Sequence, residues 1–166
     1  MKSIFVNCCK GFIYLAYLCP SIFIRMNNRK KTVYITRKEH FNAAHRLYNP
    51  KWTPEENEAF FGKCANKNYH GHNFDLYVTL KGVAQDDTGM VMDLKKLKSV
   101  IKEHVIDKLD HMNINEDVAF MKGQLASIEN IVIAIWEILE PHIELGKLHC
   151  IKLIETERNY VEYYGE

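Results

Sequence analysis

The sequence lacks an excess of charge of either sign, because 22 Lys and Arg residues face 21 Asp and Glu residues and the formal net charge is +1. Basic and acidic residues are interspersed, and the densest basic run, Arg29 to Lys31, contains no aromatic residue. Nucleic-acid-binding surfaces usually cluster basic side chains, so we expect no nucleic acid among the partners. Internal repeats and low-complexity tracts are also absent, and 166 residues suffice for one domain with its own core.

The N-terminal apolar run, Gly11 to Ile24, is too short to cross a membrane as a helix, which takes about 20 residues. A signal peptide would end in a small-residue cleavage site, but Arg25 follows Ile24. The remaining interpretation is an upstream extension with the natural start at Met26. We therefore expect residues 1–25 to lie outside the fold and residues 26–166 to form a single domain. We expect no membrane among the partners.

Cysteine is scarce in the expected domain. Three of the five cysteines fall within residues 1–25, which leaves Cys64 and Cys150. Two cysteines so far apart in the sequence do not make a disulfide framework. A reducing compartment, the cytoplasm, is therefore the simplest location.

The pattern of apolar residues predicts four strands and two main helices. The strands are expected at Lys31–His45, His72–Lys81, His149–Thr156 and Asn159–Tyr164. Arg37 and Glu39 interrupt the apolar alternation of the first strand, which a bulge could accommodate. A long loop, with a helical turn over Pro54 to Phe60, is expected between the first two strands.

The two main helices are expected between the second and third strands. Asp93 can cap the first, and Ser127 can cap the second, which Pro141 stops. The order strand, strand, helix, helix, strand, strand predicts an α+β fold: a four-stranded antiparallel sheet with both helices on one face. Such a sheet has two open edges, which oligomerisation could pair.

Three histidines are candidates for a metal site. His70 and His72 flank Gly71 at the start of the second strand, and residues two apart on a strand point to the same face. Alone, such a pair more often consists of packed or surface histidines. His45 ends the neighbouring strand and lies on the same face as the apolar residues of that strand. Three histidines without a fourth protein ligand are typical of a catalytic zinc, which keeps one position open.

Other polar residues each allow more than one interpretation. Cys64 could be a small buried residue, a fourth zinc ligand that closes the site, or a nucleophile or base. Asp110 and His111 could form an acid–base pair or simply a turn at the end of a helix. Glu155 shares a strand face with Ile151 and Leu153, so its carboxylate either meets water at the rim or pairs with the N–H groups of a ligand.

Several short motifs together resemble the family of 6-pyruvoyl-tetrahydropterin synthases and 6-carboxytetrahydropterin synthases. They run in family order from about Thr32 to the C-terminus. They are Phe41-Asn42-Ala43-Ala44-His45-Arg46-Leu47, Phe61-Gly62-Lys63-Cys64, His70-Gly71-His72-Asn73, Thr88-Gly89-Met90-Val91-Met92-Asp93, Leu109-Asp110-His111, Glu129-Asn130 and Glu155-Thr156.

The resemblance implies a tunnelling fold, in which the sheets of three subunits join into a barrel and two trimers stack as a homohexamer. It implies that Zn²⁺ binds His45, His70 and His72, that Cys64 is catalytic, and that Asp110 and His111 form a proton relay. Glu155 would anchor a pterin, assisted by Ser127 and Glu129. Relatives often carry a Thr-Thr pair where this chain has Ser127-Ile128, which puts the second side-chain contact in doubt.

The implied activity is that of a zinc-dependent lyase acting on 7,8-dihydroneopterin triphosphate. The residues from Glu155 to Tyr163 look like those of bacterial members and favour 6-carboxy-5,6,7,8-tetrahydropterin, on the queuosine route, as the product. The alternative is elimination of triphosphate to give 6-pyruvoyltetrahydropterin, on the tetrahydrobiopterin route, which the spacing of Cys64 and His70 resembles. An alternative of another class is a non-catalytic zinc module closed by Cys64.

Overall fold

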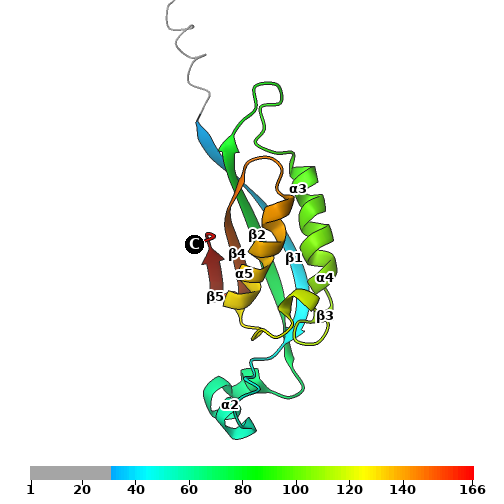
Figure 1. Cartoon of the computed structure of the whole chain (residues 1–166), viewed down its shortest axis with the longest axis vertical. Coiled ribbons are helices and arrows are strands. Elements are labelled where there is room, and N and C mark those ends of the chain that lie inside the picture. The colour runs from blue at the N-terminus through cyan, green and yellow to red at the C-terminus, as the bar shows by residue number, and fades with distance from the viewer. Residues whose placement is uncertain (1–30) are drawn as a thin grey trace, which may run out of the picture.

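The computed structural model describes residues 31–166, so the extension expected at residues 1–25 and the start expected at Met26 lie outside the described residues. Figure 1 shows helices packed in front of a sheet, with one further helix set apart from both. In chain order the elements are β1 (Thr32–His45), α2 (Pro54–Phe61), β2 (His70–Val83), α3 (Leu94–Ile101), α4 (Asp107–Leu109), β3 (Met112–Asn113), α5 (Ile128–Leu139), β4 (Lys147–Thr156) and β5 (Asn159–Tyr163).

The strands form one five-stranded sheet in the order β3-β1-β2-β4-β5. The pairs β1–β2, β2–β4 and β4–β5 are antiparallel, whereas β3 lies parallel to β1. The predicted α+β class is confirmed, but the predicted four-stranded antiparallel sheet is wrong because β3 makes the sheet mixed. At two residues, β3 is too short to show an alternating pattern, and it exists only because the chain leaving α4 runs beside Ala43 and Ala44.

The register of β1 against β2 is continuous from the pair Thr32–Val83 to the pair His45–His70, so the first strand has no bulge. Arg37 and Glu39 lie on the otherwise apolar face of β1. Their charges offset each other there, because Nε of Arg37 lies 2.6 Å from Oε1 of Glu39. The register shifts occur instead in the pairing of β2 with β4 and of β4 with β5.

One face of the sheet is covered by α5 and by the helix that runs from α3 through a π-helical turn (Lys102–Ile106) into α4. Both helices begin as predicted. The Asp93 carboxylate accepts the N–H of Lys95 at 2.8 Å, and the Ser127 hydroxyl accepts the N–H of Asn130 at 3.4 Å. The largest side chains with no exposed surface lie between these helices and the sheet, among them Phe41, Phe74, Leu76, Leu97, Ile101, Ile131 and Ile135.

The segment between β1 and β2 leaves the sheet and carries α2, which Figure 1 shows beyond the end of the strands. A capping box between Thr53 and Glu56 starts this helix. Asn57 is fully buried, accepts the N–H of Asn49 at 2.7 Å and donates to the carbonyl of Thr53 at 2.9 Å. The predicted helical turn is therefore a short helix tied to the loop before it. No helix in residues 31–166 has the length and apolarity that a membrane span requires.

Candidate metal centre and active site

The three predicted histidines meet where β1 ends and β2 begins. His45 and His70 are direct partners in the β1–β2 register, and His72 lies two residues along the same face of β2. Each histidine has a ligand atom within 4.8 Å of one on each of the others. The ring centroids are 4.6 Å apart for His45 and His70 and 5.0 Å apart for His70 and His72. The structure therefore brings together the set that could hold one metal ion.

His45 is held in one tautomer. Its side chain is 2% exposed, and its Nδ1 lies 2.8 Å from the carbonyl oxygen of Ala126, just before α5. A carbonyl can only accept, so Nδ1 carries the proton and Nε2 carries the lone pair. Burial lowers the pKa of His45 to about 4, which keeps the ring neutral near pH 7. Burial and the neighbouring His72 also lower the pKa of His70.

Two ring nitrogens in the cluster, His45 Nε2 and His70 Nδ1, are buried without a hydrogen-bond partner among residues 31–166. Moreover, Oε1 of Glu155 lies 3.4 Å from His45 Nε2 and 3.7 Å from His72 Nε2. A nitrogen lone pair and a carboxylate oxygen at this distance repel each other unless a cation lies near both. A zinc ion is coordinated by the unprotonated nitrogens of neutral imidazoles. The unpartnered nitrogens of this cluster therefore fit a metal ion.

The sequence did not show how close Glu155 lies to the candidate metal ligands. It lies on β4 with a side chain 17% exposed, so its carboxylate is neither in open water nor fully in the core. A ligand held by this carboxylate would therefore lie directly beside a metal on His45 and His72.

Cys64 lies in the short helical turn Gly62–Ala65 that follows α2, and its side chain is half-buried. Its backbone carbonyl accepts the N–H of Leu47 at 2.8 Å, which ties this turn to the chain just after His45. Within residues 31–166, the group whose ligand atoms converge on one point is the histidine triad, and Cys64 does not belong to it. The closed zinc module therefore receives no support from the structure.

Asp110 and His111 form the predicted pair, with Asp110 Oδ2 3.0 Å from His111 Nδ1. Oδ1 of Asp110 accepts the backbone N–H of Asn42 at 2.9 Å, and this bond is the main reason why the pKa of Asp110 is lowered. The backbone of His111 has a φ of 61°, and its N–H donates to Asn42. The His111 side chain is 78% exposed, so this pair faces away from the interior.

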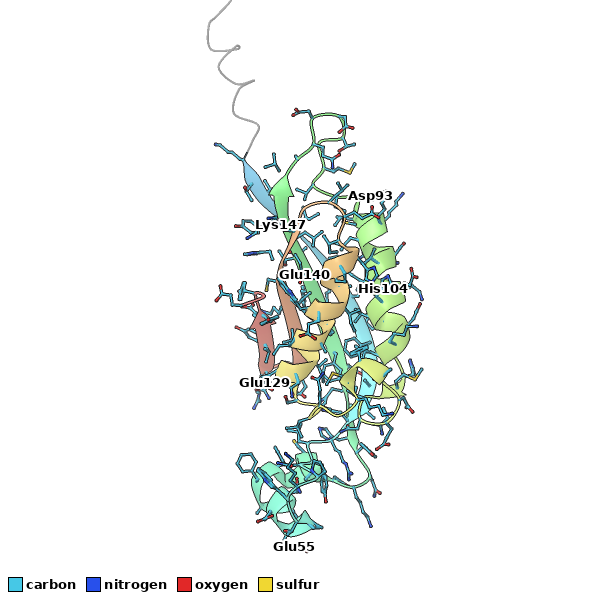
Figure 2. The ribbon with its side chains drawn as sticks, in the orientation of Figure 1. Glu55, Asp93, His104, Glu129, Glu140 and Lys147 are labelled. Atoms are coloured by element: carbon cyan, nitrogen blue, oxygen red, sulfur yellow. The ribbon has the colours of Figure 1, made fainter. Side chains whose placement is uncertain are left out.

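The start of α5 adjoins the histidine triad through Ala126. Ser127 follows Ala126 and is half-buried, with its hydroxyl engaged as the helix cap. Glu129 is exposed in the first turn of α5, where Figure 2 labels it. The two predicted substrate-binding residues thus share one helix end, and their role stays a prediction.

Sequence reasoning missed Arg46. Its guanidinium carbon lies 4.4 Å from the ring centroid of Tyr48 and 5.1 Å from that of Tyr69. Its backbone N–H donates to the side chain of Asn115 at 2.9 Å. The only signal in the sequence was its position beside His45, inside one of the family motifs.

The comparisons with known proteins agree on the family. A family model described as 6-pyruvoyl tetrahydropterin synthase matches residues 34–166. The 6-pyruvoyl tetrahydrobiopterin synthase of Dictyostelium discoideum is 46% identical over 136 residues, which cover 82% of this chain and 98% of that protein. The human enzyme of the same name is 39% identical over 138 residues, with 83% and 95% covered.

The solved structure of Caenorhabditis elegans 6-pyruvoyl tetrahydropterin synthase superposes with a TM-score of 0.79 at 38% identity, covering 83% of this chain and 99% of that one. This likeness confirms the tunnelling fold of the subunit that the sequence resemblance implied.

The preference for the carboxy product is wrong. The 6-carboxy-5,6,7,8-tetrahydropterin synthase of Haemophilus influenzae is 29% identical over 122 residues and matches 61% of this chain, well behind the pyruvoyl enzymes. The C-terminal residues on which the preference rested cover only the last two strands, whereas the pyruvoyl relatives match the whole domain. The chain belongs to the 6-pyruvoyl tetrahydropterin synthase family.

Proposed function

We propose that this chain is a zinc-dependent lyase that converts 7,8-dihydroneopterin triphosphate to 6-pyruvoyltetrahydropterin and releases triphosphate. One observation carries the proposal: in a chain of this family, the unpartnered buried Nε2 of His45 lies beside the Glu155 carboxylate and in one cluster with the unpartnered Nδ1 of His70. The names of the relatives most similar in sequence support the pyruvoyl product. The cytoplasm is the location that we expect for this activity.

His45, His70 and His72 would hold the zinc ion, with one position left for substrate. When bound, zinc would act as a Lewis acid on the hydroxyl groups of the substrate side chain and acidify the adjacent C–H bonds. The hydrogen bond from His45 Nδ1 to Ala126 directs the lone pair of Nε2 toward the ion and fixes the ring. The low pKa of His45 means that protons compete weakly for this ligand.

The Glu155 carboxylate would accept two N–H groups of the 2-aminopyrimidinone ring, and Ser127 and Glu129 would assist it from the start of α5. This arrangement would place the pterin beside the metal, since Glu155 Oε1 is 3.4 Å from His45 Nε2. Cys64, as a thiolate, would move a proton at the side-chain carbon. The Asp110–His111 pair would move a second proton, with Asp110 orienting the imidazole.

We further propose a homohexamer built from two trimers. Within residues 31–166, the outer edge of β5 has no partner strand, and β3 covers β1 only at Ala43 and Ala44. Open edges of this length favour pairing with further copies of the chain. A neighbouring subunit would also explain why His111 is so exposed for a catalytic residue.

The direct test is to incubate the zinc-loaded protein with 7,8-dihydroneopterin triphosphate and analyse the products by mass spectrometry. The proposal predicts 6-pyruvoyltetrahydropterin and inorganic triphosphate in equal amounts, without acetaldehyde. An absence of turnover with one zinc bound per chain would overturn it.

A further inference from the structure

The hydrogen-bonded ladder between β1 and β2 ends at the pair His45–His70, so two of the three candidate metal ligands lie on its last pair. Beyond this pair the strands separate into the segment that carries α2. The end of a ladder opens more easily than its centre, because fewer contacts hold it. A metal site needs its ligands within about 0.5 Å of the correct geometry, so contacts just beyond the two histidines bear directly on metal binding.

Asn115 holds the β1 side of this end. Its Oδ1 accepts the backbone N–H of Arg46 at 2.9 Å, and its Nδ2 donates to the carbonyl oxygen of the same residue at 3.1 Å. Because the N–H of Ile114 also donates to the carbonyl of Ala44 at 2.8 Å, the contact of the β3 segment with β1 continues past the end of β3. The residue that follows His45 is therefore held at both of its backbone polar groups by one half-buried side chain.

Glu116 holds the β2 side. Tyr69 precedes His70, and its hydroxyl donates to Oε1 of Glu116. The Tyr69 ring also lies 5.1 Å from the guanidinium carbon of Arg46. Tyr69 has a φ of 62°, a left-handed conformation that is rare for an aromatic residue. Such a conformation persists only where the surrounding contacts determine it, and Glu116 and Arg46 supply contacts of this kind.

The turn that carries Asn115 and Glu116 is itself tightly bonded. The backbone carbonyl of Asn113 accepts the N–H of Glu116 at 3.2 Å and that of Asp117 at 2.8 Å. The side chain of Asn113 accepts the N–H of Asn115 at 3.0 Å. Two adjacent residues of one ordered turn thus reach both strands, each at the residue next to a candidate metal ligand.

We propose that Asn115 and Glu116 are positioning residues that together clamp Arg46 against Tyr69 and so fix the separation of His45 and His70 before a metal ion binds. This inference rests on the proposed zinc site, and it adds two residues outside the ligand set that determine the affinity of that site. The clamp extends toward Cys64 as well, since the N–H of Leu47 donates to the Cys64 carbonyl at 2.8 Å.

The first measurement is the zinc affinity of the metal-free protein in competition with a chelator. The double variant Asn115→Ala/Glu116→Ala should bind zinc about tenfold more weakly, the lower end of the effect of residues that bond a ligand histidine directly. Glu116→Gln keeps an acceptor for the Tyr69 hydroxyl and should bind zinc within about twofold of wild type. Equal affinities of the wild type and the double variant would overturn the clamp.

The control for a purely structural effect is Ile101→Val in α3, where the fully buried side chain loses one methyl group away from the strand ends. This variant should be less stable than wild type but bind zinc equally well, because affinity is measured on folded protein. A loss of zinc affinity in Ile101→Val as large as that in the double variant would show that affinity follows stability alone and would overturn the positioning role.

The second measurement needs no metal: amide hydrogen exchange of the zinc-free protein, read by mass spectrometry at short labelling times. In the double variant, peptides that contain Leu47 should exchange at least about fivefold faster, because Arg46 has lost two hydrogen bonds. Peptides from the centre of β2 should stay protected. Unchanged exchange at Leu47 would overturn the clamp. If the wild type binds no zinc, the proposed activity fails, and the exchange result alone decides the clamp.

Discussion

The Nδ1 atom of His45 donates a hydrogen bond to the carbonyl oxygen of Ala126 across a distance of 2.8 Å, although the two residues are 81 positions apart in the sequence. The bond connects the end of β1 with the residues that begin α5. It fixes the tautomer of a buried imidazole and leaves Nε2 for a metal, because a ligand histidine usually donates its other ring N–H to a carbonyl or carboxylate.

The first prediction concerns the stability of the zinc-free protein. The pKa of His45 falls from 6.5 in the unfolded chain to about 4 in the folded protein. Between these values the unfolded chain binds more protons, so the free energy of unfolding should decrease as the pH falls through this window. We expect a loss of about 1.5 kcal/mol from His45 between pH 6.5 and pH 5.

Urea unfolding at several pH values would measure this loss. His45→Asn should reduce the pH dependence, and His142→Ala, at an exposed position, should leave it unchanged. Identical pH dependence in wild type and His45→Asn would show that His45 is not buried in its neutral form.

The second prediction concerns Cys64. If its thiolate moves a proton, Cys64→Ala should keep zinc and pterin binding but lower kcat by a factor of about 10²–10⁴, as is usual when a general base is removed. Zinc content, pterin affinity and kcat would be measured on the same preparation, with Cys150→Ala as the matched control. A loss of zinc in Cys64→Ala would instead identify the thiol as a metal ligand.

The third prediction concerns Glu155. Glu155→Gln replaces a carboxylate oxygen by an amide that donates where the pterin ring also donates, so pterin affinity should fall. Zinc should stay bound, because the three histidines are unchanged. Fluorescence titration with a pterin and metal analysis would separate the two effects. Unchanged pterin affinity would exclude Glu155 as the ring anchor.

The fourth prediction concerns assembly. Because the outer edge of β5 and most of that of β1 are unpaired in the part of the chain that the structure describes, sedimentation should show a hexamer. Val161→Pro in β5 should disturb the sheet, whereas a proline in the Asp86–Gly89 turn serves as the control for folding. A stable monomer at micromolar concentration would contradict the barrel.

Much of the fold was predictable because its signals are local. His72, Phe74, Leu76, Val78 and Leu80 alternate along β2, and the Ser127 cap and Pro141 delimit α5. The strand β3 was missed because its two residues carry no pattern of their own and pair only through tertiary contact. The bulge expected in β1 is absent because Arg37 pairs with Glu39, and sequence alone does not show such a pairing.

The histidine cluster was also predictable, because strand parity places His70 and His72 on one face and His45 ends the neighbouring strand. The residues that contact His45 were not predictable from the sequence, because Ala126 and Glu155 come from distant segments of the chain. Arg46 was missed because its two aromatic neighbours come together only when β1 and β2 pair. The C-terminal residues alone do not predict the product, because they make up only β4 and β5, whereas the likeness to the pyruvoyl enzymes extends over the whole domain.

The most direct test of the account is turnover of 7,8-dihydroneopterin triphosphate measured against the amount of zinc bound per chain. Zinc would be removed by chelation and returned in steps, with His72→Ala as the variant that cannot complete the site. We expect formation of 6-pyruvoyltetrahydropterin to rise in proportion to bound zinc and to saturate at about one ion per chain. Full turnover by zinc-free protein, or by His72→Ala without zinc, would contradict it.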